Sequence, residues 1–405
     1  MDRTDVAIVG AGQAGLSLAA KLRREGFDGR VSLFGEEEAV PYQRPPLSKK
    51  YLVGEFDLER LFLRPNAFFQ ENRIELRTGQ KCMSIDSERR ILTLSESQFE
   101  YKDLVLTTGS TPRRLPERIG GTLKGVFVLR NIEDADAISK ELSEGRHLLV
   151  IGGGYIGFEG ASSARSRGLQ VTVVEMAERI LQRVAAPETS RRMRELHLAH
   201  GVDVKEGVGL EKLEGADRVS EAYLSDGSSL PVDIVVVGIG IEPRDELAES
   251  AGLAIENGIV TNSLGQASAE GIWASGDCAS FPWKGKRIRL ESVQNAIEQA
   301  ETVAVNLAGA EKPYDPTPWF WSDQYDAKLQ IAGIGSGYDN VISRAGASAS
   351  SFSHWYFNGD QLLAVDAVND SRAYMVGKRL LEIGGTADKD TISDVNSNLK
   401  TLLRR

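Results

Sequence analysis

Short apolar runs recur along the first 240 residues of this chain and predict its strands. Four of them, at residues 5–9, 103–106, 147–151 and 233–237, begin with one polar residue and continue with aliphatic side chains only. Each run leads into glycine, directly or through two threonines. Uninterrupted apolar runs bounded by turn residues are typical of buried strands.

The last quarter of the chain has a different pattern, in which apolar and polar residues alternate. Residues 329–335 and 352–369 follow this pattern, and Asn358-Gly359 stands inside the second stretch. Alternation predicts half-buried strands, and an Asn-Gly pair between two such runs predicts a hairpin. A helix is expected to follow at residues 371–383, which makes this part of the chain α+β.

A glycine-rich motif follows two of the apolar runs. In such a motif the first glycine permits a tight turn, the second lets the backbone approach a pyrophosphate, and the third lets a helix pack on the strand. The pyrophosphate then meets the free N–H groups at the helix N-terminus. The six glycines are Gly10, Gly12 and Gly15 in the first motif and Gly152, Gly154 and Gly157 in the second.

An acidic residue stands at the expected distance after each motif. Glu36 follows the apolar run at residues 31–34, with Glu37 as a substitute, and Glu175 follows the run at residues 171–174. A carboxylate at this place accepts hydrogen bonds from an adenosine ribose. The alternative is a pair of glycine-rich turns that bind nothing, but two correctly spaced acids favour two bound dinucleotides.

The repeat of motifs also predicts the domain organisation. We expect an α/β chain with two Rossmann-like dinucleotide-binding domains of the three-layer ββα type and a C-terminal α+β domain. In residues 245–318, short strands are expected at 258–262 and 271–277, and a helix at 292–307. This stretch has no glycine motif of its own, so we expect the chain to return here to the first domain. The expected boundaries are 1–113 with 245–318, then 114–244, then 319–405.

Composition narrows the class of protein. A length of 405 residues is too long for one core, and the net charge of −10 argues against nucleic acid as a partner. No run approaches the roughly 20 apolar residues of a membrane span, and the N-terminus enters the first strand at once, so we expect a cytoplasmic protein without a signal peptide. The two cysteines, Cys82 and Cys278, argue against a redox disulfide, and the four scattered histidines predict no metal site.

Five further motifs resemble those of a known family. They are YQRPPLSK at residues 42–49, TTGSTPR at 107–113, GGGYIGFE at 152–159, ASGDCA at 274–279 and WFWSDQY at 319–325. Together they are similar to glutathione-reductase-type FAD/NAD oxidoreductases, and more narrowly to the FAD-dependent ferredoxin reductases of bacterial oxygenase systems. The resemblance covers nearly the whole chain. It implies FAD at the first glycine motif and NADH at the second.

The resemblance also implies the residues of the two sites. For FAD, Lys49 is expected beside the reacting ring nitrogen, and Asp277 at the ribityl and pyrophosphate. The glycines of the first motif and Glu36 belong to the same site. Its other residues are Arg44, Thr108, Gly109, Arg113, Val293, Asn295, Ala296, Trp319 and Trp321. For NAD they are Glu159 near the nicotinamide and, with the glycines and Glu175, Tyr155, Ile156, Arg183 and Gly240.

Several of these residues have an ordinary alternative role. Lys49 could be a solvated surface lysine, Asp277 a helix N-cap, and the two tryptophans core residues, although alternation places Trp319 and Trp321 on one face of a strand. Cys278 is best interpreted as a small buried hydrophobe. Glu175 favours NADH because a carboxylate repels a 2′-phosphate, while Arg179 and Arg183 leave room for some use of NADPH.

The missing cysteines determine where the electrons go. No cysteine precedes Lys81, so electrons have no thiol acceptor in this region and must leave for an external acceptor. The resemblance makes that acceptor a [2Fe–2S] ferredoxin serving a cytochrome P-450 or ring-hydroxylating oxygenase. Because such ferredoxins are acidic, a basic patch is the candidate docking surface, with an ordinary charged hairpin as its alternative. The patch consists of Lys284, Lys286, Arg287 and Arg289.

Other functions remain open at this point. A rubredoxin reductase would differ only in its acceptor, and a cysteine-free NADH oxidase or diaphorase would use a small molecule. A redox-sensing interaction protein of the apoptosis-inducing-factor type would use the same fold for docking. We expect a monomer or a weak dimer.

Overall fold

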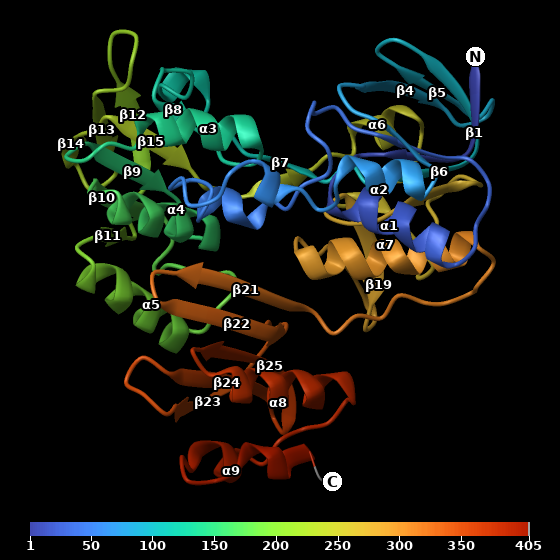
Figure 1. The fold of residues 1–405 in the computed structure, drawn as a ribbon. Coiled ribbons are helices and arrows are strands. Elements are labelled where there is room, and N and C mark those ends of the chain that lie inside the picture. The colour runs from blue at the N-terminus through green and yellow to red at the C-terminus, as the bar shows by residue number, and fades with distance from the viewer. Residues whose placement is uncertain (404–405) are drawn as a thin grey trace. The chain divides into compact units, whose positions relative to one another are not determined.

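The computed structural model describes residues 1–403, and these form two units. The first unit contains Met1–Gln43, Leu58–Thr111 and Ile241–Pro316. The second contains Arg44–Asp57, Pro112–Gly240 and the chain from Thr317 onward. Figure 1 labels the helices and strands of both units.

The first unit is built on a seven-stranded sheet in the order β3-β2-β1-β6-β5-β4, with β18 against β6. Strands β3, β2, β1, β6 and β18 run parallel, and β5 and β4 are added antiparallel. The strands are β1 (Asp2–Val9), β2 (Val31–Phe34), β3 (Ile74–Arg77), β4 (Cys82–Asp86), β5 (Ile91–Leu94), β6 (Gln98–Leu106) and β18 (Ile272–Ala274). The pairing of β18 with β6 brings the chain back to the first sheet after residue 240, as the sequence predicts.

Helices and two small sheets, β16-β7 and β17-β19-β20, complete this unit. The long helices are α1 (Gln13–Arg24) and α7 (Val293–Leu307), and α7 begins at an N-cap, Ser292, whose hydroxyl accepts the N–H of Asn295. The short helices are η2 (Glu59–Leu61), α2 (Asn66–Glu71) and α6 (Glu246–Ser250), and the remaining strands are β7 (Ser110–Pro112), β16 (Ile241–Pro243), β17 (Ile259–Val260), β19 (Ala279–Trp283) and β20 (Lys286–Ile288).

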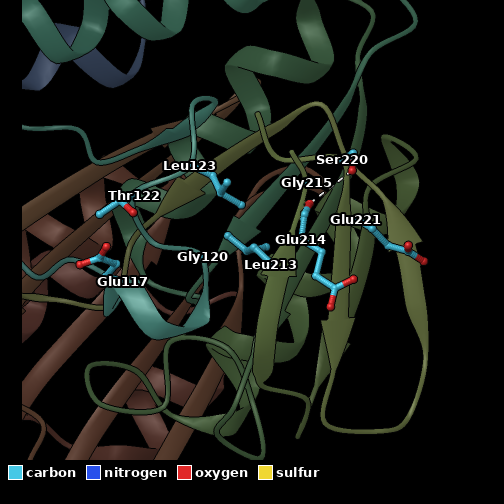
Figure 2. A pocket seen from close by; sticks show the side chains of 9 residues that line it. All are labelled: Glu117, Gly120, Thr122, Leu123, Leu213, Glu214, Gly215, Ser220 and Glu221. Carbon is cyan, nitrogen blue, oxygen red and sulfur yellow. Dashed lines mark hydrogen bonds between the residues drawn. The ribbon is translucent and has the colours of Figure 1, made fainter. Parts of the chain in front are cut away.

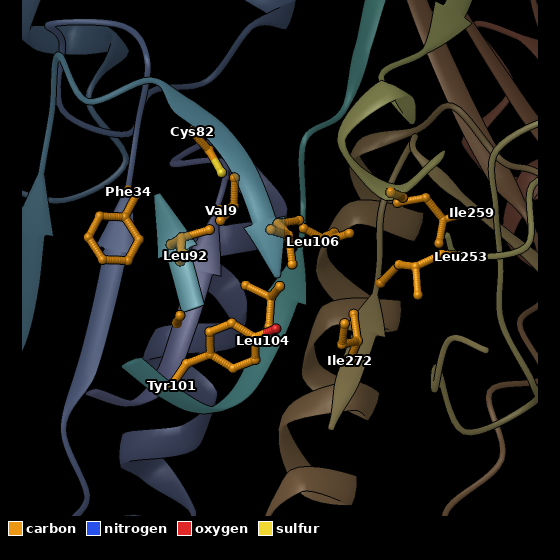
Figure 3. Close-up of a cluster of buried hydrophobic side chains, with 14 of the residues drawn as sticks. Val9, Phe34, Cys82, Leu92, Tyr101, Leu104, Leu106, Leu253, Ile259 and Ile272 are labelled. Atoms are coloured by element: carbon orange, nitrogen blue, oxygen red, sulfur yellow. The ribbon is translucent and has the colours of Figure 1, made fainter. Parts of the chain in front are cut away.

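Both faces of the first sheet are buried, which explains why its strands are continuously apolar. One face packs on α1 and α7 through Ile8, Leu18 and Val303, all fully buried. On the other face, Leu104 and Leu106 of β6 lie in a second cluster (Figure 3). Its members include Phe34, Leu92, Tyr101, Leu253, Ile259 and Ile272.

The second unit contains another parallel sheet, in the order β11-β10-β9-β15-β8. A three-stranded antiparallel sheet, β12-β13-β14, packs on it through a shared apolar cluster that includes Leu149, Val235 and Leu213. The elements are η1 (Pro45–Ser48), η3 (Glu117–Ile119), β8 (Val126–Phe127), α3 (Ile132–Glu141), β9 (His147–Ile151), α4 (Tyr155–Ser166), β10 (Gln170–Glu175), α5 (Pro187–Ala199), β11 (Asp203–Glu206), β12 (Leu210–Glu214), β13 (Glu221–Leu224), β14 (Ser229–Pro231) and β15 (Ile234–Val237).

The C-terminal part of this unit is α+β, as predicted. Its antiparallel sheet has the order β21-β22-β25-β24-β23, with α8 packed on it (Figure 1). Its elements are β21 (Trp319–Gln324), β22 (Ala327–Gly333), β23 (Asn340–Ala345), β24 (Phe352–Asn358), β25 (Gln361–Val368), α8 (Ser371–Glu382), α9 (Lys389–Ser393) and η4 (Leu399–Leu403).

The predicted hairpin is present, but its turn lies one residue later than the Asn-Gly pair. Asn358 pairs with Gln361 in the register of β24 and β25, so the turn residues are Gly359 and Asp360. Gly359 has a φ of +52°, which suits a tight hairpin turn. The predicted class, two dinucleotide-binding α/β folds followed by an α+β domain, is confirmed.

Candidate active site

The first glycine motif forms a cradle between β1 and α1 in the first unit. Gly10 has a φ of +115°, and a Cβ there would lie 2.1 Å from the carbonyl oxygen of Thr107. A Cβ on Gly15 would lie 2.1 Å from the carbonyl oxygen of Gly10. Gly12 differs, because a Cβ on it would meet no atom within 4 Å. The chain's own packing therefore explains two of the glycines and leaves the middle one facing open space.

The second motif repeats this arrangement in the second unit. Gly152 has a φ of +106°, and its Cβ would lie 2.3 Å from the carbonyl oxygen of Gly238. A Cβ on Gly157 would lie 2.5 Å from the carbonyl oxygen of Gly152, whereas one on Gly154 would meet no atom within 4 Å. The two cradles thus share one geometry, and in each the middle glycine keeps a space clear.

The helix that leaves each cradle fits an anion. Gly12 and Gly154 are the N-caps of α1 and α4, neither helix has a side-chain cap, and neither has an acidic residue in its first turn. The first N–H groups of each helix are thus left without an acceptor from a capping side chain, next to the clear space. A pyrophosphate suits such a place, because it accepts these N–H groups and favours the positive end of the helix dipole. The residues present therefore fit two dinucleotides.

Glu175 is positioned by backbone N–H groups. Its Oε2 accepts the N–H of Gly153 at 2.6 Å, and its Oε1 accepts the N–H of Ala177 at 2.8 Å. These two bonds hold the carboxylate beside the second cradle, at the end of β10. Of the two arginines considered for NADPH, Arg179 bonds within the chain, to Ser190 and to the carbonyl of Gln182, and Arg183 is exposed.

Glu36 has a different environment in the first unit. Its carboxylate pairs with Arg244 at 2.7 Å and with Lys81 at 3.2 Å. Partial burial acts to raise the pKa of Glu36, but the two cations outweigh it and lower the pKa below its usual range. The carboxylate is therefore held ionised as a hydrogen-bond acceptor, while Glu37 is used by the hydroxyl of Tyr42.

Asp277 lies in the turn between β18 and β19 and not at the start of a helix. The residues after it enter β19, so the N-cap interpretation was wrong. Its Oδ2 accepts the hydroxyl of Ser110 at 2.8 Å, and its carbonyl accepts Arg289 at 3.1 Å. The hydroxyl of Thr108 donates to the carbonyl of Arg244, which joins the predicted TTGSTPR residues to the same region of the first unit.

The other residues predicted for FAD in the first unit lie in a turn and at the start of α7. Gly109 has a φ of +74°, and its carbonyl accepts the N–H of Arg244 at 2.9 Å. Val293 is the first residue of α7. Asn295 and Ala296 are buried in the first turn of that helix.

Lys49 and Glu159 form an ion pair in the second unit, which we call the buried ion pair. Their charged atoms lie 2.7 Å apart, and the side chains are 17% and 5% exposed. Glu159 comes from α4, and Lys49 follows the short helix η1 that the two prolines of RPPLSK begin. The interpretation of Lys49 as a solvated surface lysine was therefore wrong.

Two serines also contact the carboxylate of this pair. Ser48 donates to Glu159 Oε2 at 2.6 Å, and Ser322 donates to Glu159 Oε1 at 2.7 Å. The hydroxyl of Ser163 holds the backbone of Ser48 by a bond of 2.7 Å to its carbonyl. The carboxylate therefore accepts a hydroxyl on each of its two oxygens.

The aromatic residues of WFWSDQY divide between the two faces of β21, as alternation predicts. The rings of Trp319 and Trp321 lie 5.8 Å apart on one face. Phe320 stacks on Tyr155 of the second cradle, with ring centroids 4.8 Å apart. All four rings are thus fixed within the second unit.

The remaining predicted residues of the second unit are Arg44, Arg113, Gly240, Arg183 and Ile156. The guanidinium of Arg44 donates to the carbonyl of Arg130 at 2.8 Å, and the N–H of Arg113 donates to the carbonyl of Gly240 at 3.0 Å. Gly240 has a φ of +103°, and a Cβ there would lie 3.7 Å from the guanidinium of Arg183. Ile156 lies in the first turn of α4 and is 46% exposed.

Three polar residues around the buried ion pair escaped the sequence analysis: Ser48, Ser322 and Gln324. The last two lie on the face of β21 opposite the tryptophans, and they are 0% and 1% exposed. They share that face by the alternation of the strand, but nothing in the motif indicated that this face meets a carboxylate.

Neither cysteine is reactive by its surroundings. Cys82 and Cys278 are free and buried. Burial raises the pKa of Cys82 to about 12 and raises that of Cys278 as well. The interpretation of Cys278 as a small buried hydrophobe agrees with these surroundings.

A shallow pocket elsewhere in the second unit contains none of the predicted residues (Figure 2). It is lined in part by Glu117, Glu214 and Glu221, and Glu214 pairs with the neighbouring Lys212.

Within residues 1–403, no group of three or more histidine, cysteine, aspartate or glutamate side chains could hold a metal ion. Over the same residues, no helix has the length and apolar character that crossing a membrane requires.

Comparison with known families agrees with this geometry. Residues 4–300 match the family model described as pyridine nucleotide-disulphide oxidoreductase. Residues 319–403 match the model described as reductase C-terminal.

Individual proteins are similar over the full length. The ferredoxin reductase subunit of 5,5′-dehydrodivanillate O-demethylase from a Sphingobium species is 39% identical, with 99% of each chain covered. Putidaredoxin reductase from Pseudomonas putida is 39% identical, with 98% of this chain and 96% of that protein covered. The crystal structure of the covalent putidaredoxin reductase–putidaredoxin complex matches with a TM-score of 0.95 at 38% identity, covering 100% of this chain and 99% of that one. The predicted resemblance is confirmed, and the chain belongs to the pyridine nucleotide-disulphide oxidoreductase family.

Proposed function

We propose that this oxidoreductase is an NADH-dependent, FAD-containing ferredoxin reductase that serves an oxygenase. The observation that carries the proposal is the pair of equivalent cradles, each with a clear space at its middle glycine, in a chain whose two cysteines are buried and unpaired. The relatives named as reductases of ferredoxin-type proteins support the choice of acceptor.

The chain's own residues would bind and orient the two dinucleotides. The loop at Gly12 and the first turn of α1 would hold the pyrophosphate of FAD, and the loop at Gly154 would hold that of NADH. The chemistry that FAD supplies when bound is acceptance of a hydride and release of the two electrons one at a time. Asp277, fixed by Ser110, would accept hydrogen bonds from the ribityl chain.

The buried ion pair would supply the charge at the reaction. The ammonium of Lys49 would stabilise the negative charge that arrives with the hydride, because a cation in a partly buried place acts with little screening. Glu159 would hold that ammonium in one position, since the carboxylate is itself fixed by Ser48 and Ser322.

Glu175 supports NADH as the donor. Its two backbone bonds prevent the carboxylate from turning away. A 2′-phosphate placed against it would meet a fixed negative charge, whereas a ribose would find an acceptor for its hydroxyls. We expect kcat/KM to be higher with NADH than with NADPH, and equal values would contradict this assignment.

The basic hairpin β19–β20 remains the proposed ferredoxin surface, and its residues differ in availability. Lys284 and Lys286 are exposed. Arg287 donates to the carbonyls of Thr261 and Ser280. The side chain of Arg289 is 9% exposed and pairs with Glu291 at 2.7 Å. Within the proposed patch, the two lysines are therefore the residues best placed to meet an acidic partner.

NADH-driven reduction of cytochrome c, with and without a [2Fe–2S] ferredoxin, tests the function. We expect the ferredoxin to accelerate the reaction by at least tenfold and to show saturation. Acceleration by rubredoxin alone would favour a rubredoxin reductase, and rapid oxygen consumption without any protein acceptor would favour an NADH oxidase. Slow turnover with every acceptor, together with NADH-induced dimerisation, would favour a redox-sensing interaction protein.

Charge reversal tests the docking surface. Lys286→Glu should raise the KM for ferredoxin and leave NADH-driven ferricyanide reduction unchanged. Lys102→Glu is a matched control, since Lys102 is exposed on β6 outside the hairpin. Equal effects of the two substitutions would show that net charge and not this surface controls the reaction.

A further inference from the structure

A line of buried hydrogen bonds leads from helix α5 to the buried ion pair. His197 Nε2 lies 2.8 Å from Gln324 Oε1, Gln324 Nε2 donates to Ser322 Oγ at 3.0 Å, and Ser322 Oγ donates to Glu159 Oε1 at 2.7 Å. All four side chains are at least 95% buried. We call His197, Gln324 and Ser322 the donor chain. All of these residues belong to the second unit.

The carboxylate fixes the direction of every bond in the donor chain. An ionised carboxylate can only accept, so the single hydroxyl proton of Ser322 points to Glu159. The oxygen of Ser322 is then free to accept, and it takes the amide N–H of Gln324. The amide oxygen of Gln324 in turn faces His197, which must carry its proton on Nε2. Each bond therefore donates toward Glu159.

The far end of the donor chain agrees with this direction. His197 Nδ1 is buried and has no hydrogen-bond partner among the described residues. A bare ring nitrogen tolerates that place better than an N–H, because a buried donor without a partner loses the hydrogen bond it would make to water. Burial also lowers the pKa of His197 to about 4, although its bond to Gln324 acts against the fall. The ring is thus neutral and protonated on Nε2.

The opposite direction would leave a donor unpaired. If Ser322 instead donated to Gln324, the amide of Gln324 would have to turn, with its oxygen toward Ser322 and its N–H toward His197 Nε2. The histidine proton would then stand on Nδ1 of a ring whose aromatic neighbours are Phe158 and Tyr325, with centroids 4.3 and 5.1 Å from its own. No acceptor among the described residues meets it there. The donor chain therefore favours one direction of its hydrogen bonds and one orientation of the carboxylate.

We propose that the donor chain positions the buried ion pair, by holding Glu159 Oε1 so that Oε2 stays turned toward Lys49. This proposal rests on the proposed function, in which the ion pair acts on hydride transfer. The residues of the donor chain are positioning residues, since each acts through Glu159. They also link the pair to α5 and β21, which come from separate parts of the chain.

Removal of one hydroxyl tests the proposal by kinetics. Ser322→Ala in the FAD-loaded protein should slow flavin reduction by NADH about tenfold in stopped flow, which corresponds to about 1.4 kcal/mol. The dependence on NADH concentration should stay the same, because the second cradle is untouched. Ser353→Ala is the matched control: Ser353 is also fully buried in the C-terminal sheet, and its hydroxyl accepts Trp355 Nε1 instead of contacting the ion pair. Equal rates for the two variants would overturn the proposal.

A double-mutant cycle separates positioning from a merely structural role. If Ser322 acts through the ion pair, Ser322→Ala should change the rate less than twofold when Lys49→Met is already present. The same tenfold loss in both backgrounds would show that the hydroxyl supports folding or another step, and would refute the positioning role.

Histidine variants test the far end with a readout that is independent of turnover. Nitrogen-15 NMR of the holoenzyme, labelled at its four histidines, should show His197 neutral with its proton on Nε2, and His197→Gln identifies the signal by its loss. His197→Gln keeps a neutral donor and should retain the wild-type rate, while His197→Phe should slow flavin reduction by several-fold. A proton on Nδ1, or equal rates for the two variants, would overturn the proposal.

The failure of this proposal can be told apart from failure of the proposed function. If wild-type protein is reduced by NADH and reduces ferredoxin but Ser322→Ala is unaffected, only the donor chain loses its role. If wild-type protein is not reduced by NADH, the proposed function itself fails.

Discussion

The middle glycine of the second motif offers the sharpest test of the cradles. Gly154 has extended backbone angles, φ −86° and ψ 176°, which alanine also adopts. A Cβ there would meet no atom of the chain within 4 Å. The methyl group of Gly154→Ala would therefore enter space that is clear in the protein and that the pyrophosphate of NADH is proposed to use.

The structure predicts that this variant folds normally. Alanine at a helix N-cap costs about 0.5–1 kcal/mol relative to glycine, and the reduced freedom of the unfolded chain offsets this by about 0.4–1 kcal/mol. The free energy of unfolding should thus change by less than about 0.5 kcal/mol. Gly157→Ala should behave differently, because its Cβ would lie 2.5 Å from the carbonyl oxygen of Gly152. We expect it to lose about 1–3 kcal/mol or more.

Binding should show the reverse contrast. Gly154→Ala should weaken NADH binding by at least about tenfold, or about 1.4 kcal/mol, measured from the NADH dependence of flavin reduction in stopped flow. Gly160→Ala is the matched control, since Gly160 lies within α4, six residues after Gly154, and its Cβ would also meet no atom within 4 Å. Unchanged NADH binding by Gly154→Ala would refute the assignment of this cradle. A thermal midpoint as low as that of Gly157→Ala would refute the stability argument.

Three further predictions concern other parts of the second unit. Lys49→Met should retain FAD but slow flavin reduction by about 100-fold or more, and an unchanged rate in stopped flow would contradict the role of the ion pair. Burial raises the pKa of Asp366 to about 6, although the hydrogen bonds from Tyr356 and Thr189 act to lower it. Between about pH 4 and pH 6 this carboxyl therefore ionises more readily in the unfolded chain than in the folded protein, and the free energy of unfolding falls as pH rises. Asp366→Asn should therefore raise the thermal midpoint more at pH 8 than at pH 5, and an equal change at both would exclude this residue as the cause. Arg344 is buried and donates to the carbonyls of Ile392, Val395 and Ser397 at 2.9–3.0 Å. Arg344→Met should therefore lower the free energy of unfolding by at least about 3 kcal/mol and expose residues 391–397 to limited proteolysis. A segment that stays intact under proteolysis would contradict this role.

Much of the fold could be predicted because its signals are local. A strand, a tight glycine turn and a helix need only their own residues, and Gly10 and Gly152 have the positive φ that such a turn requires. The helix expected at residues 371–383 was likewise found as α8, one residue shorter. The hairpin turn moved by one residue because cross-strand pairing, and not the Asn-Gly pair alone, sets the register.

Electrostatic partners could not be predicted in the same way. Glu36 was identified by its distance from the first motif, but its partner Arg244 lies 208 residues further along the chain. Arg289 was assigned to an exposed patch because the stretch around it is basic. The fold instead places it against Glu291 and the carbonyl of Asp277. Charge in a sequence does not tell whether a side chain will be used inside the protein or left for a partner.

The buried ion pair shows where sequence reasoning stops and why. Lys49 and Glu159 could each be identified from a motif, whereas Ser322 and Gln324 were missed, although both lie on one face of β21. The sequence does not show that η1, α4, α5 and β21 meet at one carboxylate. Each of these four elements supplies one or two polar side chains, and none of them would be notable alone. The specificity of the site therefore lies in the convergence of the elements, and a substitution such as Ser322→Ala, which alters no motif glycine and no charge, can still disturb the chemistry.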